Sequence, residues 1–197
     1  MFLAAVPGLP ASSLKDFVAY AKANPGKVNY GSSGIGSTHH LTMEAIKAEY
    51  KLDIVHVPFK GTGQSVPALV GGQVEVLWSA YPSLAGFVKD NRVKLLATNS
   101  AKRSSQAPDV PAVAETITGF DFAPIVGILA PAATPKGIVD KIAADVVAVT
   151  RNPDTQKQLA GSGIEAVGGM ADEYAKAIAD ENARMAKAIE AAGIKPE

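Results

Sequence analysis

Residues 30–40 read Tyr-Gly-Ser-Ser-Gly-Ile-Gly-Ser-Thr-His-His, and this stretch decides the fold that the rest of the chain is expected to have. It lies between a strand-like segment, residues 27–30, and a helix-like segment, residues 41–50. Glycines let the backbone approach a ligand closely, and the first N–H groups of a helix have no partner within it. The helix dipole adds roughly half a positive charge at this end. Residues 31–38, the glycine loop, are therefore predicted to hold an anion, either a phosphate or a carboxylate.

Near matches to nucleotide-binding motifs narrow the choice of anion. The glycine loop has the spacing of a phosphate-binding loop, but Ser37 stands where that loop needs a lysine. The dinucleotide fingerprint fails as well, because His39 replaces its third glycine, and no Gly-x-Ser-x-Gly nucleophile elbow occurs. A carboxylate is therefore the better prediction for the anion that the glycine loop binds. The alternative is an ordinary helix N-terminus capped by Ser37, with small residues that only make the turn.

Two further polar loops follow predicted strands. Residues 54–59 and 73–78 are expected to be strands of a parallel sheet, and the polar loops 60–65 and 79–83 come directly after them. Ligands of open α/β sheets bind beyond the carboxyl ends of the strands, so the three loops can line one crevice. The alternative is that they are simply the glycine- and serine-rich turns common in such proteins. The predicted ligand-binding residues are Ser32, Ser33, Gly34, Gly36, Ser37, Thr38, Lys60, Gly61, Thr62, Ser79 and Tyr81.

The remaining segments are predicted from periodicity and from helix signals. Ser13 and Asp16 form a plausible capping box before a helix that ends at Asn24. Further strands are expected at residues 1–6, 93–98, 122–130 and 164–167. Further helices are expected at residues 66–70, in the segment that ends at about Val88, and from Thr134 and Pro135 to Val149. Two more are expected, one that begins at Asn152 and one at residues 172–192.

Composition excludes several classes of partner. The 197 residues include 19 basic and 19 acidic side chains without a long run of one sign, so no nucleic-acid or anionic-membrane partner is expected. No apolar run is long enough for direct membrane insertion, and residues 1–6 read as a strand and not as a signal peptide. The chain has no cysteine, which leaves the compartment open.

The histidines give no sign of catalysis or metal binding. His39, His40 and His56 are the only ones, and no His-Glu-x-x-His motif or carboxylate stands at metal-ligand spacing. We expect no metal and no cofactor. His40 is expected to bond a loop carbonyl, while His56 and Trp78 are expected to be core residues. Lys60 could meet an anion, although an exposed lysine is usually just solvated.

Several short motifs, in their order and spacing, give the chain a family resemblance. It resembles the Bug, or TctC-like, family of tripartite tricarboxylate transporter binding proteins. The matching segments are residues 24–27, 29–34, 40–41, 56–61, 69–74, 108–111, 114–115, 129–131 and 134–135.

The resemblance implies a non-enzymatic, extracytoplasmic (periplasmic) solute-binding protein with a two-lobed α/β fold of the periplasmic-binding-protein-like type II. Such a protein closes on a small carboxylate and presents it to the membrane subunits of the transporter. The ligand would be a di- or tricarboxylate, an aromatic carboxylate or an amino acid. The family holds one ligand carboxylate on the loop that corresponds here to Ser32–Thr38, and the loop with Ser79 also faces its cleft. The alternative is an enzyme or a signalling or sensor module that reuses the fold, which would need a nucleophile with a positioned base.

Two departures from the family affect the expected organisation. The chain lacks the family's signal peptide and first-lobe loop, so the second lobe should be complete, the first incomplete and ligand binding weaker. We expect a hinge strand from the first lobe (1–12), a ligand-binding α/β lobe (13–104), a returning connection (105–118) and the C-terminal part of the first lobe (119–197). The second departure is Pro124-Ile125-Val126 before Gly127, where the family often has an aromatic residue.

Overall fold

The structure is a computed structural model that describes residues 1–194. It divides into two compact units, which are described separately. Unit 1 comprises Met1–Ala123 and Met185–Glu197, and unit 2 comprises Pro124–Arg184. After unit 2, residues 185–194 belong to unit 1 again.

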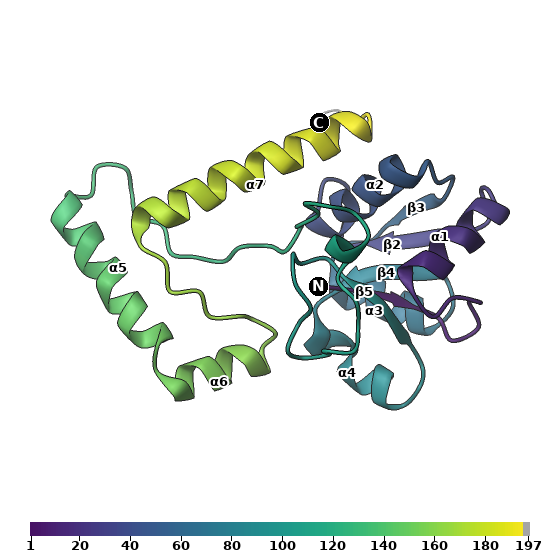
Figure 1. Ribbon diagram of the computed structural model, residues 1–197, viewed down its shortest axis with the longest axis horizontal. Coiled ribbons are helices and arrows are strands. Elements are labelled where there is room, and N and C mark those ends of the chain that lie inside the picture. Colours follow the sequence, from purple (N-terminus) through teal and green to yellow (C-terminus); the bar gives the residue numbers. More distant parts are fainter. Residues whose placement is uncertain (195–197) are drawn as a thin grey trace. The chain divides into compact units, whose positions relative to one another are not determined.

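Unit 1 is built on a five-stranded sheet with the order β3-β2-β4-β1-β5 (Figure 1). Its strands are β1 (Phe2–Ala5), β2 (Asn29–Ser32), β3 (Val55–Pro58), β4 (Val76–Ser79) and β5 (Lys94–Thr98). Its helices are α1 (Leu14–Ala23), α2 (Thr38–Tyr50), α3 (Thr62–Val70) and α4 (Tyr81–Lys89), followed by a single 3₁₀ turn, η1 (Val113–Glu115).

The sheet is mixed, whereas the sequence analysis implied a parallel one. β2 pairs with β3 and β4 in parallel, but β1 lies between β4 and β5 and runs antiparallel to both. All four residues of β1 are apolar and buried, so this strand needs a covered sheet on both faces. A central position satisfies that need, and nothing in four apolar residues specifies the direction of the strand.

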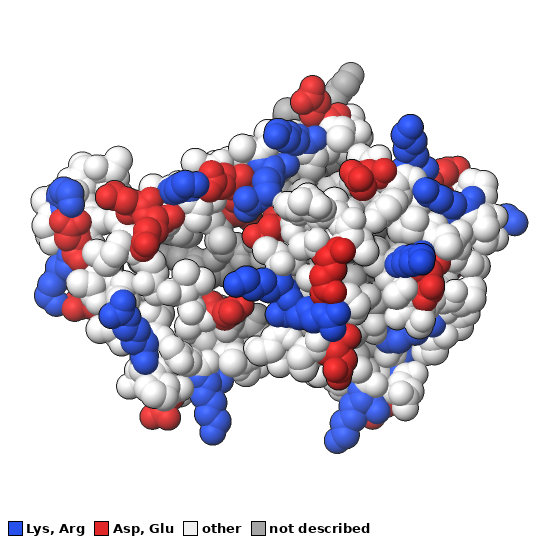
Figure 2. Space-filling model, in the orientation of Figure 1, with Lys and Arg blue, Asp and Glu red and all other residues white. Residues whose placement is uncertain are grey.

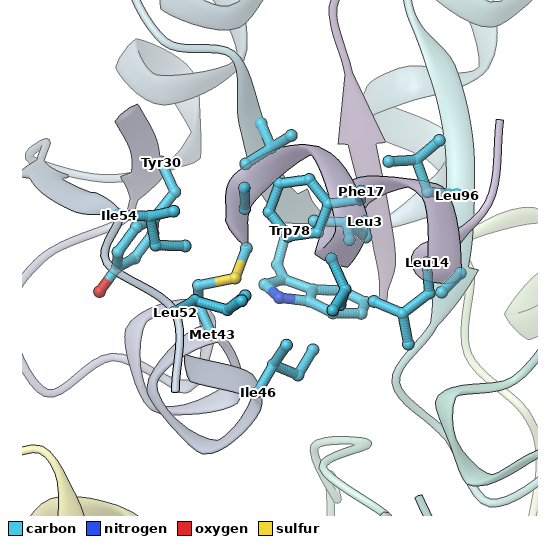
Figure 3. Close-up of a cluster of buried hydrophobic side chains, with 14 of the residues drawn as sticks. Leu3, Leu14, Phe17, Tyr30, Met43, Ile46, Leu52, Ile54, Trp78 and Leu96 are labelled. Carbon is cyan, nitrogen blue, oxygen red and sulfur yellow. The ribbon is translucent and has the colours of Figure 1, made fainter. Parts of the chain in front are cut away.

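Two separate cores cover the two faces of the sheet. Leu3 and Trp78 face one core, which is closed by α1 and α2 and shown in Figure 3. Phe2 and Leu77 face the other, which is closed by α3 and α4. Because neighbouring residues of a strand point to opposite faces, β1, β4 and β5 contribute side chains to both cores. The sheet and its two helical layers therefore form one α/β lobe.

Capping side chains mark the starts of α1 and α2, and two of the predicted helix starts were wrong. Ser37 caps α2, because its Oγ accepts the N–H of His40 at 3.3 Å, so the helix begins at Thr38 and not at residue 41. α3 begins at Thr62, four residues before the predicted start, and its N-cap residue Gly61 has no side chain to bond the helix. At α1 the Oγ of Ser13 accepts the N–H of Asp16 at 3.1 Å, as the capping box predicts.

Unit 2 consists of helices and extended segments. The helices are α5 (Lys136–Thr150), α6 (Pro153–Gly161) and α7 (Ala171–Ala191), the last of which continues into unit 1. The strands predicted at residues 122–130 and 164–167 were wrong, since neither segment forms a strand. Apolar residues alone do not make a strand, because its backbone groups also need a neighbouring strand. Val126, Leu129 and Val167 are accordingly 76%, 75% and 89% exposed.

At Gly127 the backbone lies close to the side chain of Tyr174, which is also in unit 2. A Cβ atom at this position would lie 2.3 Å from Cζ of Tyr174 in α7. The following residues, Ile128 and Leu129, line a shallow cavity of about 280 Å³ together with Tyr174 and Ile178. A larger residue here would have to displace the far end of the Tyr174 side chain.

Charged side chains of both signs are interspersed on the surface. The visible face of the described chain has no extended area of one sign (Figure 2). Exposed pairs such as Lys136–Asp140 and Lys141–Asp145 lie four residues apart on α5, where water screens both charges and each pair contributes little to stability. Among the described residues, no helix combines the length and the apolar character that crossing a membrane requires.

The difference in burial between the units predicts a difference in hydrogen exchange. No described side chain between residues 124 and 184 is fully buried, whereas Leu3, Tyr30 and Leu77 are. Because exchange of core amides requires more extensive unfolding, amides of β1, β2 and β4 should exchange more slowly than those of α5 and α6. Mass spectrometry of exchanged peptides measures this, and equal protection in both units would contradict the prediction.

Candidate functional site

Three polar loops meet at one edge of the sheet. β3, β2 and β4 are parallel neighbours, so their carboxyl ends lie together, and α2, α3 and α4 begin just beyond them (Figure 1). The first two loops are in contact, because the N–H of Phe59 donates to the carbonyl of Ser32 at 3.0 Å and Gly34 lies against the Phe59 carbonyl. The three loops thus lie at one edge of the sheet in unit 1.

The glycine loop is held by its own hydrogen bonds. The N–H of Gly34 donates to Ser32 Oγ at 3.1 Å, and the Gly34 carbonyl accepts the N–H and the hydroxyl of Ser37 at 3.2 and 2.7 Å. The N–H of Gly36 donates to Nδ1 of His40 at 3.0 Å. Gly34 and Gly36 have φ of +133° and +72°, which only glycine adopts without strain.

Four N–H groups of this region remain without a partner in the described chain. They belong to Ser33, Ile35, Thr38 and His39, all of which are at least partly exposed. Thr38 and His39 are the first two residues of α2, where the helix dipole is positive. The loop can therefore donate several hydrogen bonds to one anion without breaking its internal ones.

All three histidines contact the glycine loop. His39 Nδ1 lies 2.8 Å from Ser33 Oγ, and Nε2 of His56 lies 2.6 Å from Ser32 Oγ. The expectation that His40 bonds a loop carbonyl was wrong, because its Nδ1 accepts the N–H of Gly36. His56 has a satisfied polar contact as expected, but it lies half-buried on the edge strand β3 and not in the core.

The role of His40 has a partial signal in the sequence. In a capping box, the third residue of the helix reaches back with its side chain to a backbone N–H before the helix. Ser37 is the cap of α2 and His40 is that third residue, but its imidazole accepts the N–H of Gly36, one residue before the cap, and not that of Ser37 itself. The contacts of His39 and His56 have no such signal, because they depend on the turn of the loop and on strand pairing.

An aromatic stack lies behind the loop. The rings of His40 and His56 are parallel at 3.9 Å, and the ring of Tyr30 stacks on His56 at 4.8 Å. Burial lowers the pKa of all three histidines, that of His56 to about 4, with the neighbouring His40 lowering it further. Both stacked rings are therefore neutral at pH 7, and the loop meets an anion with dipoles and not with imidazolium charges.

The remaining predicted residues differ in their surroundings. Lys60 is exposed, and its N–H donates to the side chain of Gln64, while Gly61 caps α3 and Thr62 is its first residue. Ser79 is fully buried at the end of β4, and its Oγ has no hydrogen-bond partner among the described residues. The ring of Tyr81 packs on Phe2 and lines a separate cavity of about 300 Å³ without residues of the glycine loop.

The lobe and its loop define a periplasmic-binding-protein-like fold of type II, and comparisons agree. The structure titled "R. palustris Rpa4515 with adipate" superposes with a TM-score of 0.87 at 29% identity, covering 100% of this chain and 66% of that one. MatC from Rhodopseudomonas palustris with bound malate gives 0.75 at 26% identity, covering 95% and 65%. A UPF0065 protein of Cupriavidus necator is 34% identical over 91% of this chain and 54% of its own length.

Residues 1–194 match the family described as "Tripartite tricarboxylate transporter family receptor". The chain belongs to this family, which confirms the resemblance found in the sequence. The family and its structural neighbours are periplasmic binding proteins and not enzymes. The chain spans only about half of the length of the C. necator relative, 54%.

The lowered pKa of His56 predicts how stability depends on pH. An unfolded histidine titrates near 6.5 and folded His56 near 4, so between these values the unfolded chain binds more protons. The free energy of unfolding should therefore fall as the pH is lowered from about 6.5 to about 4. Urea denaturation at several pH values measures this fall, and H56Q should reduce it, because glutamine keeps a polar group near Ser32 but does not titrate. A fall of the same size in H56Q would contradict the assignment.

Proposed function

We propose that this chain is the ligand-binding part of a periplasmic receptor that captures a small carboxylate for the membrane subunits of a tripartite tricarboxylate transporter. The glycine loop receives one carboxylate group of the ligand. A dicarboxylate is the first candidate, because the neighbours with TM-scores of 0.87 and 0.75 contain adipate and malate. Tricarboxylates, aromatic carboxylates and amino acids share the group that this loop would bind.

The unpartnered N–H groups of the glycine loop are the observation that carries this proposal. Ser33, Ile35, Thr38 and His39 offer four backbone donors beside a helix N-terminus. Hydrogen bonds to a charged oxygen contribute about 1.5–3 kcal/mol each, so two or three of them give substantial affinity without a positively charged side chain. A neutral donor set of this kind suits a receptor that must also release its ligand.

Ser79 supports a ligand at the same edge of the sheet. A buried hydroxyl without a hydrogen bond is costly, and such atoms in native proteins usually meet a water or a ligand. The strand of Ser79, β4, is the parallel neighbour of β2, which leads into the glycine loop. We therefore propose Ser79 as a ligand-binding residue together with Ser32, Ser33, Gly34, Gly36, Ser37 and Thr38, and with the loop residues Lys60, Gly61 and Thr62.

Titration with adipate tests the site directly. In ¹H–¹⁵N NMR spectra, the amide signals of Ser33, Ile35, Thr38 and His39 should shift on addition of adipate. The method is suitable for a weak site, because it measures dissociation constants in the millimolar range. The control ligand is 1,6-hexanediol, which has the same carbon chain but no carboxylate. Equal shifts with both compounds, or shifts confined to other parts of unit 1, would refute the proposed site. Malate, citrate and benzoate then rank the ligand classes.

Gly36 and Gly72 form a matched pair of positions for mutation. Both have φ of +72°, and a Cβ atom would have no neighbour within 4 Å at either, but only Gly36 lies in the glycine loop. G36V and G72V should both lose about 1–3 kcal/mol of stability from backbone strain. Only G36V should weaken adipate binding, by about tenfold or more, because it alone changes the direction of the loop N–H groups. Equal affinity in the two variants would count against the loop.

A further inference from the structure

The side chain of His40 is fixed from three directions. It is buried, its Nδ1 accepts the N–H of Gly36 at 3.0 Å, and its ring lies parallel to that of His56 at 3.9 Å. On the other side, Nε2 of His40 lies 3.8 Å from Oε1 of Glu44, one turn further along α2. The ring can neither flip nor rotate without breaking one of these contacts.

These contacts specify which nitrogen carries the proton. A nitrogen that accepts the Gly36 N–H is unprotonated, so the proton of the neutral ring is on Nε2, which faces the Glu44 carboxylate. Glu44 is itself held by the hydroxyl of Tyr30 and by Nζ of Lys47, the latter at 2.7 Å. The chain of contacts therefore runs from Lys47 and Tyr30 through Glu44 and His40 to the backbone of the glycine loop.

Four groups face the ring of His40, and burial outweighs the one that favours its charged form. They are Glu44 and Lys47 from its own helix, Tyr30 from β2 and His56 from β3. Burial lowers the pKa of His40 and Lys47 lowers it further, while Glu44 opposes them. The acceptor at Nδ1 is thus available at neutral pH.

We propose that His40 is a positioning residue for carboxylate binding, which it serves by holding the N–H of Gly36 and hence the shape of the glycine loop. This inference rests on the proposed function, since it concerns the same loop. His40 does not itself contact the ligand in this proposal. While the N–H of Gly36 is bonded to His40, the neighbouring N–H groups of Ile35 and Thr38 stay directed to the anion. Without the acceptor, Gly36 can turn and the donors no longer converge.

The first measurement concerns the proton and needs no ligand. Long-range ¹H–¹⁵N NMR of the whole chain at pH 7 should show His40 with an unprotonated Nδ1 and a protonated Nε2. A ring protonated on Nδ1 cannot accept the N–H of Gly36, and this result would overturn the inference even if adipate binds.

The second measurement compares three substitutions at the same position. Asn carries its Oδ1 at the same number of bonds from the backbone as Nδ1 of histidine, so H40N keeps the acceptor. H40Q moves the acceptor one bond further, and H40L removes it. The loss of one hydrogen bond of about 0.7–1.4 kcal/mol predicts that H40L and H40Q bind adipate roughly threefold to tenfold more weakly, while H40N stays within about twofold of the natural chain.

The outcomes separate this inference from the proposed function. If the natural chain binds no carboxylate at the loop, the proposed function fails and the inference fails with it. If the natural chain binds adipate and H40Q or H40L binds it equally well, only the inference is overturned. If H40L does not fold, as judged by its amide spectrum, the comparison of H40N with H40Q decides, and equal weakening of both would overturn the positioning role.

Discussion

The sheet of unit 1 depends on β1, the strand of residues Phe2–Ala5. Among the described residues it alone links β4 to β5 in the sheet, and its side chains alternate between the two cores, with Leu3 in one and Phe2 in the other. Removing it would leave a three-stranded sheet and a separate fifth strand, and it would open both cores at their centre. The position of the glycine loop follows from this sheet, because β2 and β4 are aligned by the strands that flank them.

The sequence specified those features that depend on local chemistry. Ser13, Ser37 and Asn152 predicted a helix start or a possible cap, and each caps a helix in the structure. The glycine loop was recognised from its position between a strand and a helix, which the structure confirms. The order of the motifs also identified the family, although each motif alone is short.

Features that depend on distant partners could not be predicted in the same way. Four apolar residues at β1 fit a parallel or an antiparallel strand, so the mixed sheet was missed. The segments 122–130 and 164–167 have strand-like composition, but within the described chain they have no neighbouring strand. The meeting of His56 with His40 depends on the pairing of β3 with β2, which brings residues 16 positions apart in the sequence into ring contact. The stacking of these two rings behind the glycine loop can therefore be recognised only once the strand order is known.

The antiparallel direction of β1 has a practical consequence for anyone who labels this protein. Phe2 pairs with Ser79, so the beginning of β1 lies at the same edge of the sheet as the glycine loop, and the Met1 carbonyl accepts hydrogen bonds from Thr98 and Asn99 there. An affinity tag or a fluorophore joined ahead of Met1 therefore emerges beside the candidate site. A bulky fusion at that point would crowd the site, whereas a small environment-sensitive dye would make a direct optical sensor of its occupancy.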